Sequence, residues 1–286
     1  MAPEQQTKQS GTLYVVATPI GNLEDITLRA IRILGEVDVI AAEDTRHTRK
    51  LLSHLGIAKP LLSYFKDKET SRSVQILDRL KKGKIVALVS DAGTPAISDP
   101  GHIVTRMALG AGIRVVPIPG PSALTAALSV AGLEAGASLL FLGFLPSRST
   151  ARRKLLKSMV HQPCAIAFYE SPRRLEACLQ DCLAILGDRK IFWARELTKL
   201  HEEIQSSTLS RLTEELASRR VKGESVIIIQ GEDKQEEVPA AELDELLSWY
   251  KQNSGLSLKD AVRKVSNDLG LPRSKVYKKA LAIWQP

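Results

Sequence analysis

Loops that combine glycine and proline with carboxylates and hydroxyls are the parts of this chain best suited to chemistry. The richest comprises residues 90–101, with the sequence Ser-Asp-Ala-Gly-Thr-Pro-Ala-Ile-Ser-Asp-Pro-Gly, and it follows the apolar run Ile85–Val89. Glycine lets a backbone approach a ligand closely and proline fixes it, so this loop is both rigid and polar. Open α/β sheets bind ligands beyond the carboxyl ends of their strands. The pattern predicts a small-molecule site, the alternative being an ordinary connection between strand and helix.

Three further loops of this kind end expected strands, at residues 18–23, 117–123 and 168–173. A single loop of this type is weak evidence for a site, because glycine and proline also punctuate ordinary folds. Four of them, drawn from both halves of the chain, predict one cleft on which all four converge.

The elements that must position these loops alternate between strand and helix over residues 12–130, which predicts a mostly parallel, wound α/β sheet. The expected strands are 13–17, 37–41, 61–64, 85–89 and 114–117, and the expected helices are 27–34, 45–55, 68–82, 103–109 and 122–130. Further on, strands are expected at 139–142, 165–169, 191–196, 203–208 and 225–230, with helices at 152–159, 173–186 and 209–219. Fewer helices separate these strands, so a mixed second sheet is expected.

The predicted organisation has four parts: a disordered N-terminus (1–11), an α/β domain (12–120), a second α/β domain sharing the cleft (121–231) and a basic helical tail (232–286). Residues 145–153 and 231–239 have compositions typical of linkers. In the tail, apolar residues three and four apart over 257–269 precede a glycine-containing stop and a second helix, a pattern that predicts a helix-turn-helix.

The composition excludes several classes of protein. The chain has 286 residues and a formal net charge of +8, which favours a polyanionic partner such as nucleic acid. Cys178 and Cys182 resemble half a zinc site, but no second pair stands nearby and Cys164 is isolated, so no metal is expected. Residues 123–145 carry Glu134 as their sole charge, yet glycines divide them, which indicates a buried core element rather than a membrane span. The polar first ten residues contain no signal peptide, so a cytoplasmic protein without membrane contact is expected.

Basic side chains gather in three places that are candidates for RNA contact. A run of like charge is often only a solvated face, but in a helix-turn-helix beside a catalytic core it is better explained by phosphate binding. The candidates are Arg46, Arg49 and Lys50 in one helix, Arg148, Arg152 and Arg153 near residue 150, and Arg263, Lys264, Arg273, Lys275 and Lys278 in the tail.

Six ordered motifs resemble one branch of the tetrapyrrole methylase superfamily, the small-subunit ribosomal RNA cytidine 2′-O-methyltransferases. They span about residues 12–230 and the helical tail is also similar; the motifs are residues 18–27, 91–101, 119–123, 168–174, 195–199 and 223–229. The resemblance implies a two-domain class III methyltransferase fold with S-adenosyl-L-methionine in the interdomain cleft. Carried over by motif, the implied cofactor contacts are Pro19, Asp91, Ala92, Gly93, Thr94, Ile97, Ser122, Ala123, Tyr169 and Leu197.

The resemblance further implies a homodimer that methylates a cytidine 2′-oxygen in the decoding region of 16S ribosomal RNA, on an assembled small subunit. A 2′-hydroxyl is a poor nucleophile until its proton is removed, so a general base is expected. The candidates near strand ends are Asp25, Glu43, Asp44, Glu170 and Glu196, with the pair at 43–44 first because it lies opposite the glycine loop. The structural alternatives are that Asp44 caps the following helix and that Glu196 only orients Lys199 or the cofactor's amine.

Two other functions compete with this interpretation. A tetrapyrrole (precorrin-type) methyltransferase would use the same cleft but would leave the basic tail without a task. A metabolite-sensing, nucleic-acid-binding regulator would read DNA with the tail and would bind its effector in the α/β body.

Overall fold

The computed structural model describes residues 10–219, 221–232, 240–269, 271 and 273–284, and divides into two compact units, Met1–Glu232 and Asp233–Pro286. The contacts do not separate residues 12–120 from 121–231, so that boundary stays a prediction. Most of the N-terminus predicted to be disordered and most of the linker predicted at 231–239 lie outside the described residues.

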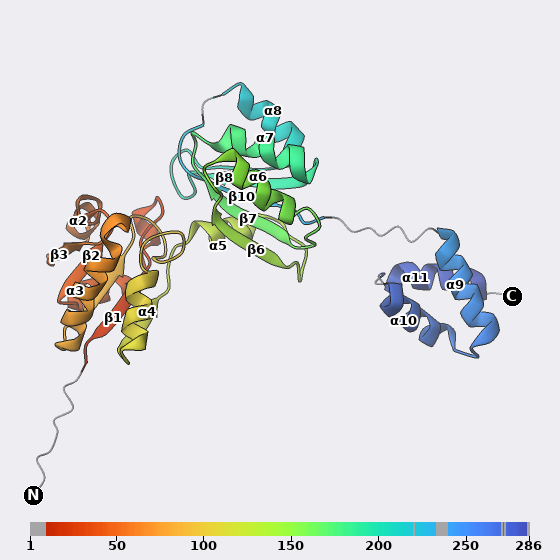
Figure 1. Ribbon diagram of the computed structural model, residues 1–286, viewed down its shortest axis with the longest axis horizontal. Coiled ribbons are helices and arrows are strands. Elements are labelled where there is room, and N and C mark those ends of the chain that lie inside the picture. The colour runs from red at the N-terminus through yellow and green to blue at the C-terminus, as the bar shows by residue number, and fades with distance from the viewer. Residues whose placement is uncertain (1–9, 220, 233–239, 270, 272, 285–286) are drawn as a thin grey trace, which may run out of the picture. The chain divides into compact units, whose positions relative to one another are not determined.

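The first sheet is wholly parallel, with the strand order β3-β2-β4-β1-β5 (Figure 1). Its strands are β1 (Thr12–Val16), β2 (Val39–Ala42), β3 (Leu61–Ser63), β4 (Val86–Val89) and β5 (Arg114–Ile118). The connecting helices are α1 (Leu28–Glu36), α2 (Thr45–His54), α3 (Glu69–Lys81) and α4 (His102–Gly110), with short 3₁₀ turns η1 (Leu23–Asp25) and η2 (Lys66–Lys68).

Helices cover both faces of this sheet, and successive side chains of a strand point to opposite faces. Every side chain of the central strand β4 is therefore buried. Val86 and Leu88 of β4 pack into the cluster beneath α3 and α4, whereas Ala87 and Val89 pack beneath α1 and α2. A strand covered on both sides reads as a continuous apolar run, which explains why residues 85–89 contain no polar residue. The sheet therefore brings the carboxyl ends of five strands to one edge.

The second sheet is mixed, with the order β6-β7-β10-β8-β9. Its strands are β6 (Leu139–Phe144), β7 (Ala165–Glu170), β8 (Lys190–Arg195), β9 (Glu203–Thr208) and β10 (Ser225–Ile229). Helices α6 (Ser149–Ser158), α7 (Leu175–Leu186) and α8 (Leu209–Ala217) pack against one face, and α5 (Ala123–Val130) packs against the other (Figure 1). The predicted α/β class, with a mixed second sheet, is confirmed.

The linker predicted at residues 145–153 is wrong. Leu145 is 2% exposed and Arg152 is 4% exposed, and Leu145 belongs to the core beneath α6 and α7. The polar composition that suggested a linker instead belongs to the exposed start of α6. Polarity at a helix N-terminus and polarity in a linker look alike in a sequence.

The apolar stretch at residues 123–145 forms α5, a loop and β6. Among the described residues, no helix is both long enough and apolar enough to cross a membrane.

The tail unit contains α9 (Ala240–Asn253), α10 (Leu258–Leu269) and α11 (Arg273–Trp284), packed around Leu247, Val265 and Val276. The two helices predicted from periodicity correspond to α10 and α11, and α9 adds a third to their core. The unit thus has an apolar centre of its own and does not depend on the sheets for one.

Candidate active site

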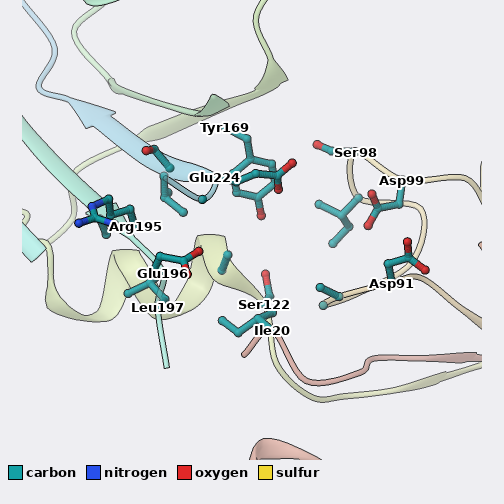
Figure 2. A pocket seen from close by; sticks show the side chains of 18 of the residues that line it. Ile20, Asp91, Ser98, Asp99, Ser122, Tyr169, Arg195, Glu196, Leu197 and Glu224 are labelled. Atoms are coloured by element: carbon teal, nitrogen blue, oxygen red, sulfur yellow. The ribbon is translucent and has the colours of Figure 1, made fainter. Parts of the chain in front are cut away.

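A pocket of about 450 Å³ lies where loops of the two sheets meet. Figure 2 shows Asp91, Ser98 and Asp99 on one side of it and Arg195, Glu196 and Leu197 on the other, with Tyr169 and Glu224 between them. The lining comes from the segments after β1, β2, β4, β5 and β8, from the ends of β6 and β7, and from the start of β10 with the loop before it. Loops at the carboxyl ends of strands therefore supply most of the wall, as predicted.

The 90–101 loop is fixed at both ends. At its start, Thr18 and Gly93 exchange backbone hydrogen bonds of 2.9 and 3.0 Å, so the loop after β1 pairs with the loop after β4. At its end, the buried carboxylate of Glu69 in α3 accepts a 2.9 Å hydrogen bond from the Gly101 amide. Gly93 has φ = +81°, a conformation that glycine adopts without strain. The loop is thus held rigid without a ligand.

The two sheets are joined beside the pocket by a close backbone contact. A Cβ on Gly21 would stand 2.9 Å from the Leu197 carbonyl oxygen, and the Asn22 amide donates a 3.0 Å hydrogen bond to the Thr198 hydroxyl. Glycine is therefore required at position 21. The contact aligns Ile20 and Leu197 along one apolar wall.

Backbone strain is concentrated in the loops on the two sides of the pocket. Within the described part of the chain, the non-glycine residues with positive φ are Ala96, Ser98, Glu196 and Thr198, with values between 49° and 70°. Such conformations cost energy and persist only where surrounding contacts impose them, most often at functional sites. Two of these residues, Ser98 and Glu196, line the pocket from opposite sides.

Five carboxylates line the pocket. Glu196 pairs with Lys199, whereas Glu43, Asp91, Asp99 and Glu224 form no ion pair with any residue that the structure describes. Burial raises the pKa of Asp99 to about 7, and the charges of Glu43 and Glu224 add to the rise. Burial also raises the pKa of Glu43, followed by the charge of Asp91. The pocket accordingly carries negative charge that a cationic ligand would neutralise.

The pair predicted as the first candidate for proton transfer divides between two roles. Glu43 lines the pocket, and its carboxylate accepts a 3.4 Å hydrogen bond from the Asp91 amide. Asp44 instead caps α2, accepting from the Arg46 amide at 2.8 Å and from its guanidinium at 2.7 Å. The hydrogen bonds from Arg46 hold the pKa of Asp44 far below its usual range. The structural alternative is therefore the one observed for Asp44.

Glu170 does not face the pocket, contrary to the sequence expectation. Its carboxylate is fully buried, accepts from the Ser171 amide at 2.7 Å and pairs with Arg174 at 2.9 Å. Because residues alternate along β7, Tyr169 points to the pocket face and Glu170 points away from it. The loop at 168–173 reaches the cleft only through Tyr169.

Glu196 lines the pocket and pairs with Lys199 at 2.8 Å. The pair lies tightly against Gly223, where an added Cβ would stand 1.9 Å from the Glu196 carboxylate. The ion pair fits the alternative in which Glu196 orients Lys199, and contact of Glu196 with the cofactor's amine stays a prediction. Asp25 lies in η1 and is absent from the pocket wall.

Nine of the ten residues implied as cofactor contacts line the pocket; Pro19 is buried behind it, and its neighbour Ile20 takes its place. Ser122 stands at the N-cap position of α5, but its side chain makes no capping hydrogen bond. The Tyr169 ring packs against Phe141 and Phe144, with centroids 5.1 and 5.6 Å away, and burial raises the pKa of its hydroxyl. The pocket combines an aromatic wall with a polar one.

The residues predicted to contact RNA differ in accessibility. Arg152 is buried and pairs with Asp181 at 2.6 Å, so the structure excludes it from contact with RNA; Arg153 shares the same carboxylate at 2.8 Å. Arg46 pairs with Asp44, and Lys264 lies over the Tyr250 ring. Arg46, Arg153 and Lys264 are exposed despite these contacts, and the remaining candidates are also exposed: Arg49, Lys50, Arg148, Arg263, Arg273, Lys275 and Lys278.

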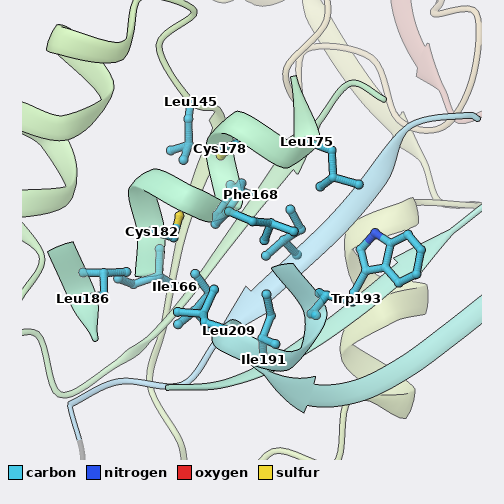
Figure 3. Close-up of a cluster of buried hydrophobic side chains, with 14 of the residues drawn as sticks. Leu145, Ile166, Phe168, Leu175, Cys178, Cys182, Leu186, Ile191, Trp193 and Leu209 are labelled. Atoms are coloured by element: carbon cyan, nitrogen blue, oxygen red, sulfur yellow. The ribbon is translucent and has the colours of Figure 1, made fainter. Parts of the chain in front are cut away.

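The three cysteines are not arranged as a metal site. Cys178 and Cys182 are buried in the apolar core of the second sheet, among Phe168, Leu186 and their neighbours (Figure 3). A mutual hydrogen bond and burial raise the pKa of the Cys178 thiol. Spacing of four residues on α7 serves packing here.

Two pocket carboxylates, Asp99 and Glu224, were not selected from the sequence. Asp99 belongs to the loop singled out first, and Glu224 belongs to the last motif. Both carboxylates lie inside segments that the sequence marks as part of the cleft, and this membership was the available signal. The candidates chosen from the sequence were instead carboxylates near the ends of expected strands.

The comparisons with known proteins agree with this geometry. The family described as Tetrapyrrole (Corrin/Porphyrin) Methylases matches residues 12–213. A protein of Xylella fastidiosa named Ribosomal RNA small subunit methyltransferase I is 46% identical over 270 residues, covering 93% of this chain and 98% of its own. One of the same name from Thermotoga maritima is 48% identical over 223 residues, covering 78% of this chain and 100% of its own. A crystal structure of uroporphyrin-III C-methyl transferase from Thermus thermophilus, complexed with S-adenyl homocysteine, has a TM-score of 0.56 at 18% identity over 77% of this chain and 97% of that chain.

Proposed function

The chain belongs to the tetrapyrrole methylase family, and we propose that it transfers a methyl group from S-adenosylmethionine to a cytidine 2′-oxygen of 16S ribosomal RNA. The relatives at 46% and 48% identity carry the RNA part of the proposal through their names. The pocket of carboxylates without cationic partners is the observation in this chain that carries the cofactor part. We also infer a cytoplasmic enzyme that acts in the decoding region of the assembled small subunit.

The pocket residues fit S-adenosylmethionine in chemistry as well as in size. This cofactor carries a sulfonium and an ammonium, which suit the unpaired carboxylates of Asp91 and Glu224. Its carboxylate and ribose suit the amides of the glycine loop, which Gly93 leaves accessible. Ile20, Ala123 and Leu197, with the Tyr169 ring, would hold the adenine.

When bound, S-adenosylmethionine supplies an electrophilic methyl group. This chain must then position the ribose hydroxyl and accept its proton. Of the carboxylates that line the pocket, Asp99 is best matched to that task, since a base works best when its pKa lies near the working pH. Glu43 and Glu224 act through Asp99 by holding its pKa high. Transfer would break the sulfonium–methyl bond of the bound cofactor, leaving a thioether, and would form the oxygen–carbon bond, while the Asp99 carboxylate would accept the hydroxyl proton.

RNA binding is supported by exposed cations outside this pocket. Arg49 and Lys50 are exposed on α2, the helix that begins two residues after Glu43, and the exposed cations of the tail include Arg263, Arg273 and Lys275. Phosphates release counterions when they meet such side chains, so affinity would fall with salt. The negatively charged pocket and the positively charged surfaces are therefore separate parts of the molecule.

A homodimer would cover the apolar part of α5 and the edge strand β6. Val130 is 54% exposed and Phe144 is 38% exposed, and β6 has β7 as its sole partner strand in the sheet. Unpaired apolar edges invite association. Light scattering at micromolar concentration should give twice the mass of one chain, and a monomer with full activity would remove this part of the proposal.

The test of function is methyl transfer from labelled S-adenosylmethionine to small subunits and to naked RNA from cells lacking this protein. After alkaline digestion, label in a resistant dinucleotide would support the ribose 2′-oxygen, because methylation there blocks cleavage. Label on a base would support RNA methyltransferase activity but would show that the ribose 2′-oxygen is not the atom methylated. Cofactor binding without any labelled RNA would favour a tetrapyrrole substrate.

A further inference from the structure

A second cavity lies in the tail, between α10 and α11. Its volume is about 420 Å³, and its lining is Lys259, Val262, Arg263, Arg273, Ser274 and Tyr277. Residues three and four apart share a helix face, so each helix contributes one continuous stripe to the cavity. This is the size of cavity that accepts small organic groups.

The cavity joins an aromatic and aliphatic surface to a cationic rim. Tyr277 is 46% exposed, and Val262 lies beside it in the lining. Lys259 and Arg273 form no ion pair within the described residues, and Arg263 meets only the exposed carboxylate of Asp260, at 3.1 Å. The tail also contains Trp249, which is 54% exposed but does not line the cavity.

Folding of the tail does not require the exposed ring. The unit is held together by Val265, Val276 and Ala280, each fully buried. Tyr250, by contrast, is 8% exposed and is part of that core. The ring of Tyr277 thus leaves much of its surface for contact with something other than the tail.

We propose that this cavity binds one unpaired nucleotide of RNA, with its base against Tyr277 and its phosphate held by Arg273 and Lys259. The inference rests on the proposed function, because it takes RNA as the substrate. Single-stranded RNA is recognised by aromatic rings that stack on splayed bases, combined with cations that hold the backbone. A cationic surface that only followed phosphates would need no apolar floor, and paired bases in a duplex could not enter the cavity.

The experiment measures fluorescence anisotropy of a labelled twelve-nucleotide single strand and of the same strand in a duplex, with the full-length protein. Tyr277→Ala should weaken single-strand binding by roughly 5- to 150-fold, the range that loss of one stacked base produces. Tyr277→Phe should bind as the unaltered protein does, and Trp249→Ala is the matched control that should leave affinity unchanged. Duplex binding should be indifferent to all three substitutions.

The salt dependence of the affinity distinguishes the contribution of the base contact from that of the phosphate contact. Arg273→Gln should reduce the slope of log affinity against log salt by about 0.7, the value for one phosphate contact on a single strand, whereas Tyr277→Ala should leave the slope unchanged. Equal binding by Tyr277→Ala and the unaltered protein would overturn the proposal. So would complete displacement of the RNA by an equimolar acidic peptide.

These measurements do not depend on methyl transfer. An unaltered protein that binds the strand through Tyr277 but methylates no ribosomal RNA would refute the proposed function and leave the nucleotide cavity standing. Methylation that proceeds while Tyr277→Ala binds RNA normally would refute the cavity alone.

Discussion

The two cavities of this protein have similar volumes, about 450 and 420 Å³, and opposite charge. The first is lined by Glu43, Asp91, Asp99 and Glu224, and the second by Lys259, Arg263 and Arg273. A cationic cofactor suits the first, and a polyanion suits the second. Under the proposals made above, chemistry and the capture of RNA are assigned to different cavities.

The cavities also differ in construction. The walls of the first contain the strained residues Ser98 and Glu196, whereas regular helices provide the wall of the second. Strain is tolerated where groups must be held in fixed geometry, and binding of a flexible strand needs no such fixation. The Thermotoga maritima relative matches 78% of this chain over its own whole length.

The largest effect is expected from Asp99→Asn. Loss of a general base typically lowers the rate of the chemical step by about 10²- to 10⁴-fold, and cofactor affinity should change only a few-fold. For the unaltered enzyme, kcat/KM should rise as the pH passes through about 7, because Asp99 must be deprotonated. In the variant this rise should disappear. If kcat/KM of the variant still rises near pH 7, a group other than Asp99 accepts the hydroxyl proton.

Asp99 also makes a prediction about stability. Its folded pKa lies above the unfolded value, so its protonation stabilises the folded state at low pH, and this stabilisation is lost as the pH rises through about 7. Asp99→Asn should therefore raise the melting temperature at pH 8 and leave it little changed at pH 4. Lower stability at pH 8 would contradict burial of an ionised carboxylate.

Removal of residues 233–286 should lower affinity for single-stranded RNA by about 100-fold at 0.1 M salt, because several phosphate contacts are lost together. Cofactor affinity, measured by calorimetry, should remain within twofold, since the first cavity lies wholly in Met1–Glu232. Loss of both affinities would show that the cavities are not independent. Loss of sequence-specific binding to duplex DNA would instead favour the regulator.

A smaller effect is expected from Gly223→Ala. The added Cβ would collide with the Glu196 carboxylate and separate it from Lys199, and φ at this position is +75°. Cofactor affinity should fall about tenfold, equivalent to about 1.4 kcal/mol. Gly187→Ala is the matched control, because its φ is +80° but its Cβ would meet nothing within 4 Å. Equal losses in the two variants would mean that backbone strain alone is responsible.

The smallest effect on activity is expected from Glu170→Gln. The change weakens the buried pair with Arg174, so the free energy of unfolding should fall by about 1–3 kcal/mol while kcat stays within threefold. Glu176→Gln, on the exposed side of α7, should change neither quantity. A kcat loss comparable to that of Asp99→Asn would return Glu170 to the chemistry.

The strands and helices were largely predictable because their apolar periods are strong, and the glycine-rich loops located the pocket. Side-chain direction at strand ends was not. Tyr169 and Glu170 are neighbours in sequence, yet alternation along β7 brings one to the pocket and buries the other. Arg152 in α6 is buried because it pairs with Asp181 in the next helix, α7. The basic sequence around Arg152 does not indicate this pairing. Asp99 was missed because its importance comes from Glu43 and Glu224, which only the tertiary structure brings near it.

The division between the two cavities is tested most directly by single-turnover methyl transfer across a range of RNA concentrations, with Asp99→Asn and Tyr277→Ala measured side by side. Asp99→Asn should lower the rate at saturating RNA and leave the half-saturating concentration unchanged, whereas Tyr277→Ala should raise the half-saturating concentration and leave the rate at saturation unchanged. A rate loss at saturation in Tyr277→Ala, or weaker RNA binding with a normal rate in Asp99→Asn, would show that the two cavities do not have separate roles.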